Sequence, residues 1–105
     1  MFMSDCVFCK IIAGELPADV SFEDDKVVVF ASIDPKAKTH LLIVPRKHIR
    51  TIAEMEEGDE ILVGHMVKIG KEVAAKLGLK GYKLNFNVGE GGGQEVFHIH
   101  LHLLS

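Results

Sequence analysis

The sequence predicts one α+β domain over residues 1–105, with a five-stranded, mainly antiparallel sheet, one short N-terminal helix and one long helix. Of its 105 residues, 48% are hydrophobic and 26% charged, which suffices for one core. One segment, 59–77, has strong helical periodicity. The expected order of elements is α-β-β-β-α-β-β, and the lack of regular strand-helix alternation favours an antiparallel sheet over a doubly wound one.

The first expected element is a short helix over residues 6–13. Ser4 or Asp5 precedes it, and a side-chain oxygen there accepts hydrogen bonds from the unpaired backbone N–H groups of the first turn. Gly14 follows it and is suited to a helix C-terminus.

Three strands are expected next. Segments 20–22 and 26–31 are rich in β-branched residues and flank the acidic turn 23–25, a pattern typical of a hairpin. Segment 40–44 is a short apolar run that Pro45 ends.

The long helix is expected over residues 59–77. Its apolar residues recur every three or four positions and form one stripe: Leu62, Met66, Ile69, Val73 and Leu77. Acidic residues begin the segment, Lys76 lies near its end and Gly78 follows, all consistent with the helix dipole and with a glycine C-cap.

Two further strands are expected, over 82–88 and 96–104. The second places an imidazole at every other position: His98, His100 and His102. In a strand these side chains share one face, about 6.6 Å apart. The intervening residues would then enter the core: Phe97, Ile99, Leu101 and Leu103.

The charge pattern excludes two classes of partner. Twelve Lys and Arg against 15 Asp and Glu give a net charge of −3, so nucleic acid and membrane surfaces are not expected partners. No apolar run approaches the roughly 20 residues that span a bilayer. Residues 1–5 lack the features of a signal peptide, so a cytoplasmic location without structural disulfides is expected.

The histidine row is the strongest chemical signal. Imidazole serves as a metal ligand, a general acid or base, or a nucleophile near neutral pH. Just before it, glycine-rich segment 89–93 is able to turn backbone N–H groups inward as an anion-binding nest. No Gly-Lys-Ser/Thr and no helix follow, so it is neither a Walker A loop nor a dinucleotide fingerprint. Together the two segments indicate a phosphate held beside a nucleophile.

Cys6 and Cys9 form a CxxC motif with three interpretations. A redox pair normally follows a strand, and none is expected here. Two inert buried thiols are the simplest alternative. A tetrahedral zinc site needs two more ligands, which His, Asp or Glu must supply because the chain has two cysteines in all.

The segments around the histidine row resemble the histidine-triad (HIT) superfamily, most closely its Hint branch. The specific matches are Asn87, the Gly93-Gln94-Glu95-Val96-Phe97 segment and the alternating histidines. Weaker matches extend the resemblance over nearly the whole chain, from Phe8-Cys9-Lys10-Ile11-Ile12 onward. The resemblance therefore implies a HIT-like domain.

The family resemblance also implies an activity. Hint proteins are phosphoramidases that cleave P–N bonds at the α-phosphate of purine nucleotides such as AMP conjugates. By this likeness His100 is the nucleophile and forms a nucleotidyl-histidine intermediate, His102 and His40 orient and stabilise the phosphate, and His98 supports His100. Two alternatives stay open: a dinucleoside-polyphosphate hydrolase, and a nucleotide- or zinc-binding adaptor with incidental hydrolysis.

The resemblance further assigns binding residues. Phosphate or the leaving group would be bound by Asn87 and by the backbone at Gly93, Gln94 and Glu95. The base pocket would be lined by Phe8, Ile11, Phe30 and Ile33. Ser32 stands where relatives commonly carry an acidic ribose-binding residue, and Asp34, two positions later, is able to share its face.

A structural zinc ion and a second copy of the chain complete the expectations. In HIT proteins with this CxxC, the residues matching Cys6, Cys9, His48 and His98 bind the zinc, and the chemistry itself needs no cofactor. A homodimer is expected because the long helix has an apolar stripe and the sheet has free edges. The resemblance to Hint proteins also implies a homodimer.

Overall fold

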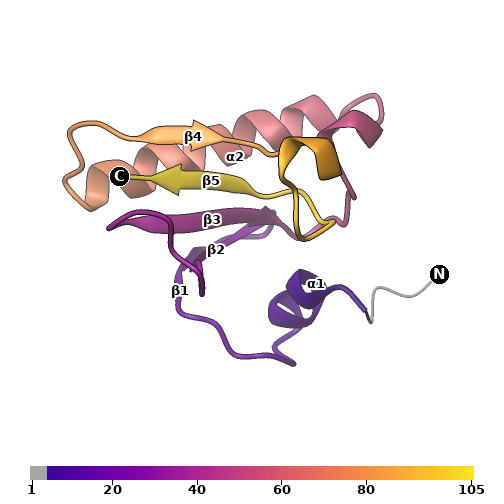
Figure 1. The fold of residues 1–105 in the computed structure, drawn as a ribbon, viewed down its shortest axis with the longest axis horizontal. Coiled ribbons are helices and arrows are strands. Elements are labelled where there is room, and N and C mark those ends of the chain that lie inside the picture. The colour runs from indigo at the N-terminus through magenta and orange to yellow at the C-terminus, as the bar shows by residue number, and fades with distance from the viewer. Residues whose placement is uncertain (1–4) are drawn as a thin grey trace.

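The computed structural model describes residues 5–105 as a five-stranded sheet with helices on both faces (Figure 1). The elements are α1 (Val7–Ile12), β1 (Val20–Glu23), β2 (Val27–Ala31), β3 (His40–Pro45), the 3-10 turn η1 (Ile52–Glu54), α2 (Asp59–Lys76), β4 (Lys83–Asn85), the 3-10 turn η2 (Glu90–Gly92) and β5 (Leu101–Leu104). The strand order is β1-β2-β3-β5-β4, and every neighbouring pair is antiparallel. The predicted α+β class and sheet type are confirmed.

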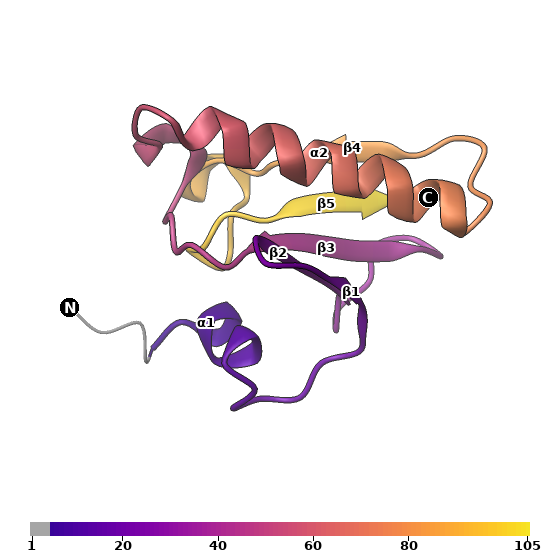
Figure 2. The ribbon, with the colours of Figure 1, turned by 180° about the vertical axis from the view of Figure 1, so that it is seen from behind.

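The central strands β2 and β3 are buried on both faces because α2 and α1 lie on opposite sides of the sheet (Figure 2). One core joins α2 to the sheet through residues such as Val27, Val29, Ile43, Met66 and Leu101. The other lies beneath α1 and consists of Phe8, Val28, Phe30, Leu42 and Val44. Strand β2 contributes to both cores, which explains why its sequence is continuously apolar rather than alternating.

The cap of α1 differs from the prediction. Cys6 is the N-cap, and its Sγ accepts the Cys9 N–H at 3.4 Å, so Asp5 does not fill this role. Ser4, the other predicted cap, lies outside the described residues. Gly14 follows the helix with a φ of +79°, as its predicted place at the C-terminus requires.

The last two strands are shorter than predicted. Strand β4 ends at Asn85, before Asn87, and β5 begins only at Leu101. Pairing between β3 and β5 runs no further than Ile43 opposite Leu101. Upstream of this point the chain leaves the sheet, because the Ile99 N–H bonds to the Ile49 carbonyl beyond the end of β3. His98 and His100 therefore precede the strand, and only His102 lies on it.

Two side chains depart from their predicted burial. Phe97 does not enter either core but lies under the Arg50 guanidinium, 5.2 Å from the ring centroid. Leu77, the last residue of the predicted apolar stripe, follows α2 as its C-cap and is exposed. Among residues 5–105, neither helix is long and apolar enough to cross a membrane.

Candidate functional site

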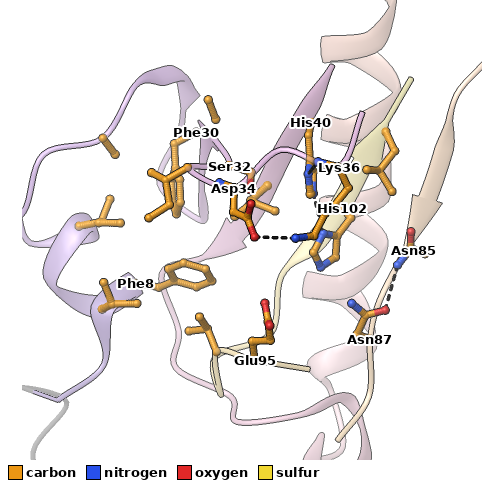
Figure 3. Close-up of a pocket in the computed structure, with 18 of the residues that line it drawn as sticks. Phe8, Phe30, Ser32, Asp34, Lys36, His40, Asn85, Asn87, Glu95 and His102 are labelled. Carbon is orange, nitrogen blue, oxygen red and sulfur yellow. Dashed lines mark hydrogen bonds and ion pairs between the residues drawn. The ribbon is translucent and has the colours of Figure 1, made fainter. Parts of the chain in front are cut away.

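A cavity of about 500 Å³ opens between α1, one face of the sheet and the loop after β4 (Figure 3). Its lining includes eleven of the predicted residues: Phe8, Ile11, Phe30, Ser32, Ile33, Asp34, His40, Asn87, Gly93, Glu95 and His102. Phe8 and Phe30 meet edge to face, with ring centroids 5.4 Å apart, at the apolar side of the cavity. Histidine, amide and carboxylate side chains occupy the other side, so the cavity has an apolar slot and a polar end.

His100 is not among the residues that line this cavity, but it packs against two that do, Phe8 and His102. Its ring packs edge to face on Phe8, with centroids 4.9 Å apart, and contacts the His102 ring at 4.7 Å. Its Nδ1 is 2.8 Å from the His98 carbonyl oxygen. A carbonyl only accepts, so Nδ1 carries the proton and Nε2 keeps its lone pair. Burial lowers the pKa of His100, which favours this neutral form.

His40 and His102 form a directed hydrogen-bond chain. The Lys36 backbone N–H donates to His40 Nδ1 at 3.0 Å, so the His40 proton is on Nε2. That Nε2 lies 2.9 Å from His102 Nδ1 and donates to it. The proton of neutral His102 is consequently on Nε2. Among the buried side-chain nitrogen and oxygen atoms of residues 5–105, this Nε2 is the one without a hydrogen-bond partner.

The two imidazoles of this chain stay neutral at ordinary pH. Burial, then the neighbouring His100 and His40, lower the pKa of His102 to about 4. Burial, then Lys36, lower the pKa of His40. His102, which lines the polar end of the cavity, therefore keeps a buried N–H donor without a partner and carries no charge.

The glycine-rich loop is not the open anion nest that its sequence predicts. The N–H groups of Gly93 and Gln94 already donate to the carbonyls of Glu90 and Gly89. The Gln94 side chain is buried and closes the loop: its Oε1 accepts the Gly89 N–H, and its Nε2 donates to the carbonyls of Arg50 and Val96. Gln94 thus stabilises the conformation of the loop and does not line the cavity.

Other polar groups remain available near the loop. The structure gives the Glu95 N–H no hydrogen-bond partner among residues 5–105, and Gly93 and Glu95 line the cavity. Asn87 accepts a hydrogen bond from Asn85 at 3.2 Å through Oδ1, which leaves its amide N–H groups for a ligand.

The segment between β2 and β3 supplies a lining residue that sequence reasoning missed. Lys36 lines the cavity, pairs with the Asp34 carboxylate and donates its backbone N–H to His40. Ser32 Oγ accepts the Asp34 N–H at 3.2 Å, so Ser32 and Asp34 share one turn. No local motif marks Lys36, because its role depends on a main-chain group.

A second group of side chains, the Cys/His cluster (Cys6, Cys9, His48 and His98), lies at the N-terminal end of α1. Their ligand atoms all lie within 4.8 Å of one another. His98 Nε2 is 2.7 Å from the Pro45 carbonyl and carries its proton, which leaves the Nδ1 lone pair facing the thiols. Such a bond on the second ring nitrogen is typical of a metal-bound histidine.

The distances in the Cys/His cluster fit tetrahedral zinc. Bonds of about 2.3 Å to sulfur and 2.0 Å to nitrogen separate ligand atoms by about 3.3 Å for two nitrogens and about 3.5 Å for nitrogen and sulfur. The two Nδ1 atoms are 3.1 Å apart, and three sulfur to nitrogen distances are 3.3, 3.4 and 3.5 Å. Without a metal, burial and the Cys6 thiol raise the pKa of Cys9 to about 11, whereas a bound cation favours the thiolate.

The remaining histidine stands apart from both groups. His65 lies on α2, with its Nε2 2.8 Å from the Asp24 carboxylate. Neither the cavity lining nor the Cys/His cluster includes it. The molecule thus combines a cavity lined by two imidazoles, His40 and His102, with a four-ligand site to which the same C-terminal segment contributes His98.

Known proteins are similar to this chain in sequence and in fold. Residues 5–105 match the family model described as "Scavenger mRNA decapping enzyme C-term binding". Protein HitA of Neisseria gonorrhoeae is 43% identical over 103 residues, covering 97% of this chain and 96% of that protein. A crystal structure of a HIT family hydrolase from Legionella pneumophila is 52% identical with a TM-score of 0.92, covering 95% of this chain and 91% of that one.

A zinc-bound structure is also similar. It is a histidine triad family protein from Mycobacterium smegmatis, 30% identical with a TM-score of 0.87, covering 98% of this chain and 76% of that one. These matches extend over nearly the whole chain and agree with the fold described above. The chain belongs to the HIT family.

Proposed function

We propose that this protein is a nucleotide phosphoramidase that cleaves P–N bonds at the α-phosphate of purine nucleotides through a nucleotidyl-His100 intermediate. The observation that carries the proposal is that two neighbouring imidazoles offer nitrogens with complementary roles, one an acceptor and one a donor. His100 offers a lone pair on Nε2, and the neighbouring His102 offers an unpaired N–H on its own Nε2. A nucleophile and a hydrogen-bond donor at one end of an apolar slot suit attack on a phosphate.

The binding mode follows from the two ends of the cavity. The base would lie in the apolar slot of Phe8, Ile11, Phe30 and Ile33, and the ribose would contact the turn of Ser32 and Asp34. The phosphate would then lie among His40, His102, Asn87 and the loop at Gly93 and Glu95.

The chemistry proceeds in two displacement steps. His100 Nε2 attacks the α-phosphorus, the P–N bond of the substrate breaks, and the amine departs with a proton taken from water. His102 Nε2–H donates to a phosphate oxygen as charge develops on it, and its geometry is set in advance by His40. Water then hydrolyses the bond between phosphorus and His100, which releases the nucleoside monophosphate and restores the imidazole.

The Cys/His cluster would hold a structural zinc ion, and no step of the reaction uses it. Cys6, Cys9, His48 and His98 present a set of two sulfurs and two nitrogens typical of closed structural sites. The zinc would stabilise the connection between α1 and the segment before β5.

We also propose a cytoplasmic homodimer. Ile61, Val67, Leu77 and Tyr82 are exposed apolar side chains on α2 or just beyond it, and β4 is an edge strand. A second copy would cover such a surface with an isologous interface. Light scattering at micromolar concentration tests this: the mass of two chains is expected, and the mass of one chain contradicts it.

The test of the activity compares two substrates. Turnover of adenosine 5′-phosphoramidate is expected to exceed that of diadenosine polyphosphate under the same conditions, with the His100→Ala variant as the control for contaminating hydrolases. Faster turnover of the polyphosphate identifies a dinucleoside-polyphosphate hydrolase instead. Binding of AMP with turnover of neither substrate identifies an adaptor.

A further inference from the structure

We infer that the Cys/His cluster also positions the nucleophile, because His98 belongs to both groups: its ring is a ligand of the cluster, and its carbonyl orients His100. This inference rests on the proposed function for its catalytic consequence. His98 and Phe8 are accordingly positioning residues, and His100 is the catalytic residue on which they act.

The first link runs through the main chain of His98. The ring is fixed at both nitrogens, by the Pro45 carbonyl at 2.7 Å on Nε2 and by the thiols and His48 on Nδ1. The carbonyl of this same residue accepts the His100 Nδ1–H at 2.8 Å. A shift of the His98 ring therefore displaces the acceptor that keeps the lone pair of His100 on Nε2.

The second link runs through the residue between the two cysteines. Phe8 packs edge to face on His100, with centroids 4.9 Å apart, and also contacts His98 at 6.0 Å. It lies on α1, which has six residues and is far too short to be stable alone. The Cys6 thiol caps this helix, and both thiols contact His98. Ligation by these thiols would thus hold α1, and Phe8 with it, against the nucleophile.

The tautomer of His100 depends on a single hydrogen bond. Its ring otherwise meets His102 at 4.7 Å, and among residues 5–105 the bond to the His98 carbonyl is its one side-chain hydrogen bond. If that bond is lost, the proton is free to move to Nε2, which removes the lone pair that attacks phosphorus. A displacement of about 1 Å at a reacting centre costs about 10²-fold in rate.

His48 provides the cleanest test because it is a member of the cluster but lines no part of the cavity and has no recorded contact with His100. The full-length, zinc-loaded chain is compared with His48→Asn, which removes one ligand, and with His48→Cys, which restores a four-ligand set of the Cys₃His type. His65→Asn, on α2, is the matched control.

Three quantities are measured on each protein: zinc per chain, the ¹⁵N ring signals of His100 in histidine-labelled protein, and the single-turnover rate at saturating adenosine phosphoramidate. We expect His48→Asn to lose zinc, to show a mixture of His100 tautomers and to react about 10- to 100-fold more slowly. His48→Cys should regain zinc, the single Nδ1–H tautomer and a rate within about 3-fold of wild type. His65→Asn should match wild type in all three.

The contrary result is equally clear. A His48→Asn protein that has lost its zinc but keeps a single Nδ1–H tautomer and the wild-type rate overturns the inference. So does a wild-type chain that binds no zinc. If His48→Asn does not fold, Phe8→Leu takes its place: it retains all four ligands, and an unchanged tautomer and rate would overturn the link through Phe8. The tautomer signals are measured without any turnover. A His100 that shows the single Nδ1–H tautomer in zinc-loaded protein but never becomes nucleotidylated therefore contradicts the proposed function and leaves the positioning of His100 intact.

Discussion

The two groups of histidines in this protein differ in which way their nitrogens face. In the Cys/His cluster, His48 and His98 direct Nδ1 atoms toward each other and toward two thiols, at 3.1 to 3.5 Å. In the cavity, His40 and His102 instead form a chain in which each ring accepts at Nδ1 and carries its proton on Nε2: His40 donates this proton to His102, and the His102 Nε2–H has no partner among residues 5–105. The first arrangement concentrates lone pairs, as a metal site requires, and the second delivers an N–H group to a ligand.

This difference shows that, in each imidazole, the hydrogen bond made by one ring nitrogen determines whether the other nitrogen is a donor or an acceptor. The Pro45 carbonyl accepts a hydrogen bond from His98 Nε2–H, so the Nδ1 lone pair is available for a metal. The Lys36 N–H occupies His40 Nδ1, so Nε2 is the donor. Burial lowers the pKa of His98 and of His102 to about 4, so their different roles do not come from different protonation.

The largest effect is expected at His100. Replacing it with Ala should reduce kcat by about 10⁴-fold or more, because the covalent route is lost. Affinity for AMP should fall much less, since the apolar slot remains. Steady-state turnover of adenosine phosphoramidate and calorimetric binding of AMP measure the two quantities.

His65→Ala is the control for this substitution, because it removes an imidazole outside both groups. It should leave kcat within about 2-fold of wild type. A His100→Ala protein that retains more than a tenth of wild-type turnover would place the nucleophile elsewhere.

A smaller effect is expected at His102. Removing one preorganised donor to a developing charge costs about 10²- to 10³-fold in other enzymes. His102→Ala should therefore slow turnover by about 10²-fold, less than His100→Ala, because it stabilises charge without forming the bond. Equal losses in the two variants would contradict this division of roles.

Stability should depend on the Cys/His cluster rather than on the cavity. A metal present at about 100 times its Kd contributes about 2.7 kcal/mol, and this corresponds to about 10 to 20 °C in Tm for a domain of this size. Treatment with a chelator, or Cys9→Ser, should lower Tm by this amount in thermal unfolding followed by circular dichroism. An unchanged Tm after exposure to chelator means that the cluster holds no structural metal.

The smallest effect is the pH dependence that His102 adds to stability. Its folded pKa is about 4 against an ordinary value of 6.5, so the unfolded chain binds the proton first as pH falls. This group's contribution to stability is present above pH 6.5 and decreases as pH falls from 6.5 to about 4. Urea unfolding of wild type and His102→Asn over this range should show a smaller loss for the variant. Parallel curves would show that His102 is not held neutral by the fold.

Much of the fold was predictable because the spacing of apolar residues along the chain indicates which side chains are buried. The α2 stripe and the apolar run of β3 gave the correct elements, and Pro45 ends β3 in the structure. The extent of β5 was not predictable, because its alternation continues through His98 and His100 after the ladder has ended. Alternation marks an extended chain, whereas a strand also needs a partner.

The candidate site divides in the same way. The histidine row and the CxxC were found from residue type and spacing, whereas His40, His48 and the aromatic residues of the slot came from the family resemblance. The anion nest was wrongly expected to be open, because the Gly93 and Gln94 N–H groups pair within the loop and the Gln94 side chain closes it. Lys36 escaped notice because it acts on His40 through its main chain. Pairing between main-chain groups has no local signature in a sequence.

One measurement tests the central claim most directly. Wild-type protein is mixed with an adenosine phosphoramidate that carries a radiolabelled phosphate, and the reaction is quenched within a single turnover. We predict acid-labile label on the protein, mapped by peptide analysis to His100, and none on His100→Ala. Full turnover without labelled protein, or label on another residue, would contradict the account.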